Sequence, residues 1–261
     1  MNNPRVRELQ KLSKPRDRKE SGLFVIEGRK EIMLAFDHGY DFESLWVCRE
    51  IGEASEFNDV SERFSAIGVP LIEISAHVFS KLAYRENSDG VLGVAHARNH
   101  SLKDLDLPST PLVVVLEAVE KPGNLGAILR TADAAGVDAV ILCNPRTDLY
   151  NPNVVRSSIG CLFSQQIAVT SSASALTFLR ERGIIIYAAY LTARLKYHEA
   201  DFRGASAIVM GTEADGLSEF WLKNCDQGII IPMRGAIDSL NVSTSTAIIV
   251  FEAMRQRGFD G

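Results

Sequence analysis

Polar side chains are concentrated between residues 239 and 246, where a helix is expected to begin. An apolar strand at residues 228–231 leads through a Pro/Gly loop into this segment, and the helix should run over about residues 241–256. One Ser or Asn is enough to cap a helix, whereas this segment holds six polar residues, namely Ser239, Asn241, Ser243, Thr244, Ser245 and Thr246. The excess predicts that the loop and the first helical turn bind a polar ligand through side chains and backbone N–H groups.

Two other segments repeat this order of apolar strand, glycine-bearing turn and helix. Residues 112–119 lead into a turn at 121–126, and residues 207–210 lead into a turn at 211–218. Helices are expected to follow from about Ala127 and Glu219. Ligands of α/β proteins gather at the carboxyl ends of such strands, where glycine lets the backbone come close. Three such turns in one half of the chain therefore predict a single ligand pocket.

The elements that position these turns divide the chain into two expected domains. Residues 1–98 alternate short helices and strands, which predicts a small α/β sandwich. Residues 99–110 are rich in Pro, Ser and Asp and are expected to be a linker. In residues 111–261, six apolar segments alternate with five helical ones, which predicts an α/β domain whose parallel sheet has helices on both faces.

The bulk composition describes a soluble globular protein of 261 residues, of which 46% are hydrophobic. No apolar run approaches the ~20 residues that a membrane span needs, and the polar N-terminus does not resemble a secretory signal. Four scattered cysteines, Cys48, Cys143, Cys161 and Cys225, match neither a disulfide framework nor a zinc site. These observations predict a cytoplasmic protein without a bound metal.

Basic residues are concentrated at the N-terminus, although the net charge of the chain is −5. The first nineteen residues contain seven basic and two acidic side chains. A local positive potential can attract RNA phosphates, while a solvated surface helix explains the same composition equally well. The candidates for phosphate binding are Arg5, Arg7, Lys11, Lys14 and Arg16.

Several common catalytic motifs are missing from the sequence. It has no Gly-x-x-x-x-Gly-Lys-[Ser/Thr] loop for nucleoside triphosphates, no His-Glu-x-x-His and no Gly-x-Ser-x-Gly. The five histidines are dispersed and lie outside the three turns. Phosphoryl transfer by a P-loop, zinc-dependent hydrolysis and Ser-based hydrolysis are therefore disfavoured.

The three turns also carry an ordered set of residue types. This set resembles, in order and spacing, the three motifs of the SpoU (TrmH-like) branch of the SPOUT RNA methyltransferases: Asn124-x-Gly126-x-x-x-Arg130, then Gly211-Thr212-Glu213-x-x-Gly216-Leu217-Ser218, then Ile231-Pro232-Met233-x-Gly235 with Ser239-Leu240-Asn241-Val242-Ser243. The resemblance covers the chain from about Pro111 onward. Residues 22–28, Gly-Leu-Phe-Val-Ile-Glu-Gly, look like part of the substrate-binding domain that precedes the catalytic domain in many members.

The resemblance implies an enzyme that transfers a methyl group from S-adenosyl-L-methionine (SAM) to a ribose 2′-hydroxyl of structured RNA. It favours 23S ribosomal RNA over transfer RNA, and it implies an L30e-like RNA-binding fold for residues 1–98. It also implies a C-terminal trefoil knot and a homodimer formed through the C-terminal domain. The alternatives are a transfer RNA 2′-O-methyltransferase, a methyltransferase acting on a base nitrogen, and a non-catalytic RNA-binding ribosome-assembly factor.

By the same resemblance, the second and third turns recognise the cofactor. One wall of its site would hold Met210, Gly211, Glu213 and Gly216, and the other wall Ile231, Met233, Leu240 and Val242. Glycines would let backbone groups bond the cofactor, and aliphatic side chains would enclose its adenine. The simpler alternatives are that Ile231, Leu240 and Val242 pack in the core and that the glycines only form turns.

Arg130 matches the arginine that the family has been thought to use as the base for the 2′-hydroxyl proton. A guanidinium has no acceptor and a pKa above about 12, so it can instead bind an RNA phosphate and stabilise developing alkoxide charge. Asn124 would cap the helix that presents Arg130 or bond the substrate. Glu213 would orient Arg130 or Asn124. In the dimer, Arg130 of one chain would serve the cofactor of the other.

Two further matches concern the substrate. Asn241 and Ser243 match the polar pair of the third motif and would hold the ribose, its phosphate or the cofactor carboxylate. Arg156 matches a position where related methyltransferases carry a basic residue that faces RNA, and a solvated helix surface is the alternative explanation.

Overall fold

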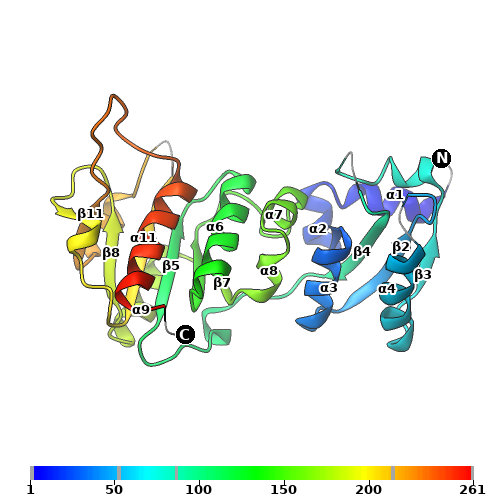
Figure 1. The fold of residues 1–261 in the computed structure, drawn as a ribbon, viewed down its shortest axis with the longest axis horizontal. Helices are drawn as coiled ribbons and strands as arrows, with labels where there is room; N and C mark the ends of the chain where they lie inside the picture. Colours follow the sequence, from blue (N-terminus) through cyan, green and yellow to red (C-terminus); the bar gives the residue numbers. More distant parts are fainter. Residues whose placement is uncertain (1–2, 52–53, 86–87, 213–214, 260–261) are drawn as a thin grey trace. The chain divides into compact units, whose positions relative to one another are not determined.

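The computed structural model describes residues 3–51, 54–85, 88–212 and 215–259 (Figure 1). The chain divides into two compact units that do not follow the expected boundaries. The first unit contains Met1–Arg98 together with Asp148–Ser164, and the second contains Asn99–Thr147 together with Gln165–Gly261. Residues 148–164, which lie inside the range expected for the catalytic domain, thus pack with the N-terminal unit.

The first unit is built on a four-stranded sheet in the order β1-β4-β2-β3. Strand β4 (Val91–His96) runs antiparallel to both β1 (Leu23–Glu27) and β2 (Phe42–Val47), and β3 (Leu71–Glu73) runs parallel to β2. The helices of residues 3–98 are α1 (Pro4–Lys11), α2 (Pro15–Ser21), α3 (Arg29–Asp37), α4 (Ala54–Ala66) and α5 (Ala76–Phe79). This arrangement confirms the predicted small α/β unit.

Helices α1 and α2 give the basic N-terminal segment a fixed place in the first unit. Asn3 caps α1 by accepting a hydrogen bond from the Arg5 N–H, and a proline occupies the first turn of each helix. Val6, Leu9 and Leu12 join an apolar cluster over the sheet that includes Trp46. The segment is therefore a packed, amphipathic element and not only a solvated helix.

The sequence pattern predicts one helix over about residues 153–160, as one of the five helical segments of residues 111–261, and the segment 148–164 differs from this prediction. It forms two short helices, α7 (Pro152–Ser157) and α8 (Cys161–Ser164), because Ile159 and Gly160 adopt positive φ values of 53° and 81° between them. Aromatic burial holds the segment in the first unit: the rings of Phe24 and Tyr150 lie 4.1 Å apart, and those of Tyr40 and Phe163 lie 4.9 Å apart. Such contacts between distant residues leave no local pattern in the sequence.

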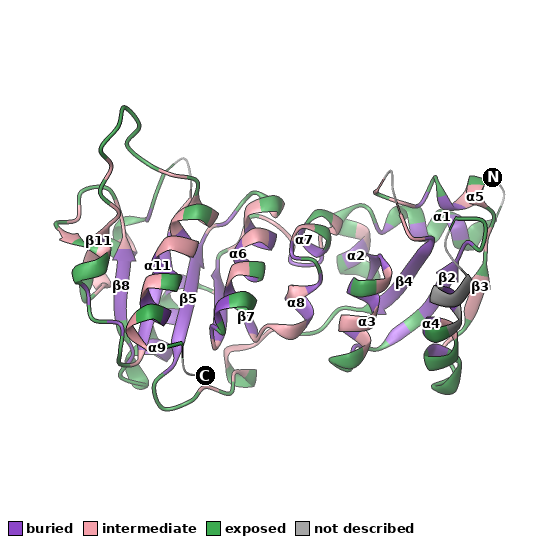
Figure 2. Cartoon of the chain, viewed as in Figure 1, coloured by how far each residue is buried: buried purple, intermediate pink, exposed green. Residues whose placement is uncertain are grey.

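The second unit has a seven-stranded sheet in the order β7-β6-β5-β10-β8-β11-β9, and every pair of neighbouring strands is parallel. The strands are β5 (Leu112–Glu117), β6 (Ala139–Cys143), β7 (Ile167–Thr170), β8 (Ile185–Ala189), β9 (Leu195–Lys196), β10 (Ser206–Met210) and β11 (Gln227–Ile230). The central strands β5 and β10 are buried along their whole length, as Figure 2 shows for β5. The predicted parallel α/β sheet is confirmed, and the edge strand β9 is an addition to the expected elements.

Helices cover both faces of this sheet. Helices α6 (Pro122–Ala135) and α11 (Val242–Gln256) lie side by side on one face (Figure 1). Helices α9 (Ser172–Glu181) and α10 (Glu219–Asn224) bury Phe178, Leu179 and Trp221 in a core on the other face. Residues 99–110, expected to be a linker, contain a short 3₁₀ helix at Leu102–Asp104, and leucines of this segment pack against the same core.

Helix α6 begins at Pro122 and not near Ala127, where the sequence analysis placed its start. Pro122 occupies the first turn, which suits its fixed φ and its lack of a backbone N–H.

Within the described ranges, every helix is too short or too polar to cross a lipid bilayer.

Candidate functional site

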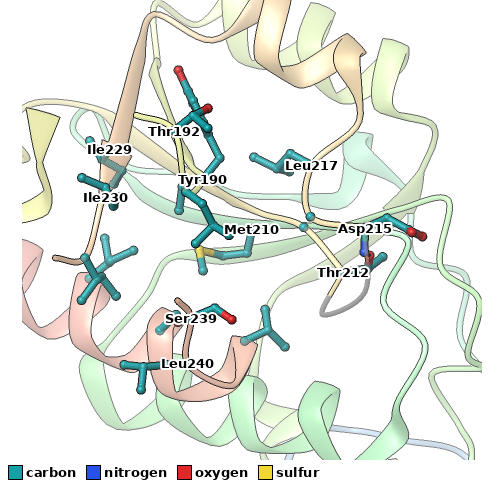
Figure 3. Close-up of a pocket in the computed structure, with 18 of the residues that line it drawn as sticks. Tyr190, Thr192, Met210, Thr212, Asp215, Leu217, Ile229, Ile230, Ser239 and Leu240 are labelled. Carbon is teal, nitrogen blue, oxygen red and sulfur yellow. The ribbon is translucent and has the colours of Figure 1, made fainter. Parts of the chain in front are cut away.

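A pocket of about 360 Å³ lies at the carboxyl ends of β8, β10 and β11 (Figure 3). Its described lining comes from Leu222 on α10 and from residues within the segments 189–192, 210–217, 229–233 and 239–249. The last segment brings the polar start of α11 against the ends of the strands. The pocket thus occupies the place where parallel α/β sheets bind their ligands.

Seven of the eight residues predicted to bind a cofactor line this pocket: Met210, Gly211, Gly216, Ile231, Met233, Leu240 and Val242. The eighth, Glu213, lies outside the described residues. Ile231, Leu240 and Val242 are partly exposed and face the pocket, so simple core packing does not account for them. Their part in cofactor binding remains a prediction.

Close backbone contact explains Gly211, and a left-handed backbone conformation explains Gly216. A Cβ atom on Gly211 would overlap the backbone carbonyl of Gly216, and Gly216 itself has a φ of 67°. Two hydrogen bonds between Thr212 and Gly216 close the turn, with N–O distances of 3.0 and 3.1 Å. Residues other than glycine would therefore open this wall of the pocket.

A hydrogen bond between two asparagines connects the first and third turns. The Asn241 side-chain oxygen caps α11 by accepting from the Ser243 N–H at 2.9 Å and from the Ser243 hydroxyl at 2.6 Å. Its amide Nδ2 is thereby directed to the Asn124 Oδ1, at 3.2 Å. Asn124 does not cap α6, because Lys121 occupies the N-cap position and Asn124 lies inside the first turn.

Arg130 lies on α6 and is exposed to solvent. Among the described residues it has no hydrogen-bond or ion-pair partner, and it is not part of the pocket lining. An exposed guanidinium with no described partner can bind a phosphate, or the site of a second chain. The position of Arg130 therefore fits phosphate binding and also action at the site of a second chain.

The remaining predicted RNA-binding residues lie in the first unit. Arg156 is exposed on α7, and Arg5, Arg7, Lys11, Lys14 and Arg16 are exposed on or beside α1 and α2. Arg16 pairs with Glu20 at 2.7 Å. Arg18, from the same basic stretch, is instead 4% exposed and bonds Asp148 at 2.6 Å, so it has a structural role.

Sequence reasoning missed several pocket residues, including Tyr190, Thr192 and Asp215. Tyr190 and Thr192 follow β8, which lies beside β10 in the sheet, and no glycine-bearing motif marks that loop. Asp215 is the one charged residue among the described lining residues. Its carboxylate favours a ligand that carries positive charge.

The buried polar groups around the site do not suggest other chemistry. Burial, and next the nearby Glu117 carboxylate, raise the pKa of the Cys143 thiol to about 12. The thiol therefore stays protonated at neutral pH and is a poor nucleophile. No group of three metal-ligating side chains is found within the described ranges.

Two sequence profiles match the chain: that of the SpoU rRNA methylase family over residues 111–251, and that of the MRM3-like substrate binding domain over residues 3–93. A 23S rRNA (guanosine-2′-O-)-methyltransferase RlmB of Ralstonia nicotianae is 36% identical over 205 residues, which are 76% of this chain and 82% of that protein. An uncharacterized tRNA/rRNA methyltransferase of Synechocystis is 29% identical over 248 residues, and the match covers 92% of this chain and 65% of that longer protein. The crystal structure of an AdoMet-bound rRNA methyltransferase from Sinorhizobium meliloti superposes with a TM-score of 0.90 at 30% identity, covering 98% of this chain and 95% of that one.

Proposed function

Because this chain belongs to the SpoU rRNA methylase family, we propose that it transfers the methyl group of SAM to a ribose 2′-hydroxyl of structured RNA. The observation that carries the proposal is the meeting of the three turns: the second and third line one pocket, and the Asn241–Asn124 bond adds the first. We propose 23S ribosomal RNA as the substrate, since the Ralstonia relative is named for that activity. The cytoplasm is the proposed site of action.

The pocket suits SAM in size and in chemistry. About 360 Å³ lies within the range of small-molecule sites. Backbone groups at Gly211 and Gly216 would bond the polar parts of the cofactor, and Ile231 and Leu240 would enclose its adenine. Asp215 would favour its positive charge. When bound, SAM supplies a methyl group already activated by its sulfonium.

The protein must then align the hydroxyl and favour the loss of its proton to solvent. We assign to Arg130 the binding of an RNA phosphate and the stabilisation of alkoxide charge, because a guanidinium cannot accept a proton. Asn124 and Asn241, joined by their hydrogen bond, would fix the two turns on which the ribose is held.

The first unit would capture the RNA. Its exposed basic residues on α1 and α2 provide phosphate contacts, and the packing of α1 over the sheet fixes their spacing. We propose that Arg156 on α7 belongs to the same RNA-binding surface, because α7 is part of this unit. Residues 1–98 would then bind RNA and residues 111–261 would carry out catalysis. Residues 148–164 are the exception, because they belong to the RNA-binding unit.

A homodimer and a trefoil knot complete the proposal. Phe251 on α11 is 42% exposed, which supports an interface formed by α11 and its neighbour α6. In such a dimer, Arg130 would serve the pocket of the partner. The knot is supported by the return of the chain from β11, near one edge of the sheet, to α11, which packs on α6 and β10.

The link between the first and third turns gives a separate prediction. Replacing Asn241 with Ala should lower the free energy of unfolding by about 1 kcal/mol through loss of the cap, and should also lower methyl transfer. Replacing it with Ser should keep the cap, since a serine oxygen can also accept from the Ser243 N–H, while the shorter side chain no longer reaches Asn124. Thermal unfolding and methyl transfer, measured on both variants, check this. Full activity in the Ser variant would show that the bond between the turns is dispensable.

The function is tested by radiolabelled methyl transfer to total RNA from a strain that lacks the protein. We expect label in the 23S fraction, and nuclease digestion with mass spectrometry should place the methyl group on a ribose. Label in the transfer RNA fraction would identify the other substrate, and label on a base would identify base-nitrogen methylation. RNA binding with no calorimetric heat on SAM addition would indicate a non-catalytic assembly factor.

A further inference from the structure

A buried carboxylate, Glu117, lies at the end of β5 beside the site. Glu117 is 7% exposed. Each of its carboxylate oxygens accepts a hydrogen bond from Ser218, at the end of the second turn. The Ser218 N–H donates to Oε2 at 2.8 Å, and the Ser218 hydroxyl donates to Oε1 at 2.7 Å. The Ser172 hydroxyl donates to Oε1 at 3.3 Å.

The direction of these hydrogen bonds is fixed by the donors around Ser172. The Trp221 indole N–H donates to the Ser172 oxygen at 3.2 Å, and the Asn144 amide donates to it at 3.1 Å. These two bonds occupy both lone pairs of the hydroxyl, so its own hydrogen is left to donate, and Glu117 Oε1 lies 3.3 Å from the Ser172 oxygen. The Ser218 N–H can only donate. These donors match a carboxylate, which can accept on both oxygens, better than an amide, which has one accepting oxygen.

The residues held by Glu117 connect directly to the pocket. Ser218 is the N-cap of α10 and follows Leu217, which lines the pocket. Trp221, in the same helix, is fully buried and bonded to Ser172. On its other side, Glu117 is followed by Ala118, whose φ of 51° turns the chain toward the first motif. The Glu117 carboxylate thus holds the end of the second turn against β5, the strand that leads into the first turn.

We propose that Glu117 is a positioning residue that holds Gly216 and Leu217, at the end of the second turn, in the geometry that binds SAM. The role rests on the proposed function, because it concerns the same pocket. Glu117 does not line the pocket, so it acts through Ser218 and Leu217. No glycine-bearing motif contains it, and its signal in the sequence is one acidic residue at the end of an otherwise apolar strand.

The test is Glu117→Gln. The glutamine NH₂ group would face the Ser218 and Ser172 donors, and at least one of the three hydrogen bonds to residue 117 would be lost. We expect calorimetry to show a roughly tenfold or larger rise in the Kd for SAM, because a bond to a charged acceptor is lost in a buried site. The KM for SAM should rise in parallel, while kcat at saturating SAM and the Kd for RNA stay near their wild-type values.

Glu27→Gln is the matched control. Glu27 is also 7% exposed and accepts two backbone N–H groups, from Tyr84 at 2.7 Å and Arg85 at 3.3 Å, but it belongs to the first unit. This variant should lose stability without a change in the Kd for SAM. Ser218→Ala, which removes one of the three donors, should shift the Kd in the same direction by a smaller factor, and it serves if Glu117→Gln does not fold.

The outcomes separate this proposal from the proposed function. If wild-type protein gives no heat with SAM, the proposed function fails. If wild type binds SAM and the variants at Glu117 and Ser218 bind it equally well, the positioning role is wrong. A fall in kcat with an unchanged KM for SAM would also overturn it, since that pattern assigns Glu117 to the chemical step.

Discussion

Replacing Arg130 with alanine is expected to lower kcat for RNA methylation by about 10²–10³-fold, the loss typical of removing one group that stabilises transition-state charge. The Kd for SAM should not change, because Arg130 is outside the described pocket lining. The folded state should not lose stability either, because Arg130 is exposed and has no described partner. Single-turnover methyl transfer measures the rate of methylation, and calorimetry measures the Kd for SAM and the stability of the folded state.

Arg130→Lys distinguishes forked bonding from simple charge. A lysine keeps the positive charge but cannot form the two parallel bonds of a guanidinium to a phosphate, so this variant should also be nearly inactive. Arg203→Ala is the control, since Arg203 is an exposed arginine that pairs with Asp201 at 2.8 Å. Activity restored by lysine would mean that a point charge suffices, and an active Arg130→Ala would remove Arg130 from the mechanism.

Replacing Gly211 with alanine should weaken SAM binding by about 100-fold or more. The added methyl group would overlap the Gly216 backbone, so one wall of the pocket must shift, and shifts of about 1 Å at a reaction site can cost a factor of 10². Both the Kd for SAM and methyl transfer should be affected, while RNA binding is retained. Isothermal calorimetry with SAM is the direct measurement.

Gly204→Ala provides the matched control for this substitution. A Cβ atom at Gly204 would meet no heavy atom within 4 Å, and its φ lies outside the left-handed region. It should bind SAM as wild type does. SAM binding by Gly211→Ala at the wild-type Kd would show that this turn does not form the cofactor wall.

The two inactive variants together test whether the site is completed by a second chain. Coexpressed Arg130→Ala and Gly211→Ala subunits would form mixed dimers in which one intact pocket meets one intact arginine. If Arg130 acts across the interface, the mixture should recover about a quarter of wild-type activity, since half of the dimers are mixed and each has one working site. No recovery would place both residues in the same chain's site.

The sequence was sufficient to locate the pocket, because its information is local. Strand ends, glycines and the polar start of α11 are close together along the chain, and the helix was expected at 241–256 where α11 spans Val242–Gln256 with Asn241 as its cap. Parallel strands bring such turns to one edge of the sheet. Seven residues that the family resemblance assigns to cofactor binding therefore line one pocket.

The features that were missed depend on partners far away in the sequence. The predicted start of α6 lies too late because the prediction assigns Pro122 to the turn, whereas proline is favoured in a first helical turn. Residues 148–164 were assigned to the second domain because their aromatic partners, such as Phe24, lie more than a hundred residues earlier. The role of Glu117 was not predicted because its donors, Ser172 and Ser218, lie at the starts of two helices more than fifty residues away.

The membership of residues 148–164 in the first unit has a consequence for how the protein is synthesised. A growing chain that has emerged only as far as Arg98 lacks Tyr150 and Phe163, which cover Phe24 and Tyr40, and it lacks Asp148, which neutralises the buried Arg18. Although this unit is synthesised first, its core is not complete until the ribosome has added residue 164. Five strands of the second sheet have not been completed at that point. The N-terminal unit therefore has to wait, with aromatic side chains uncovered, for a segment encoded well downstream.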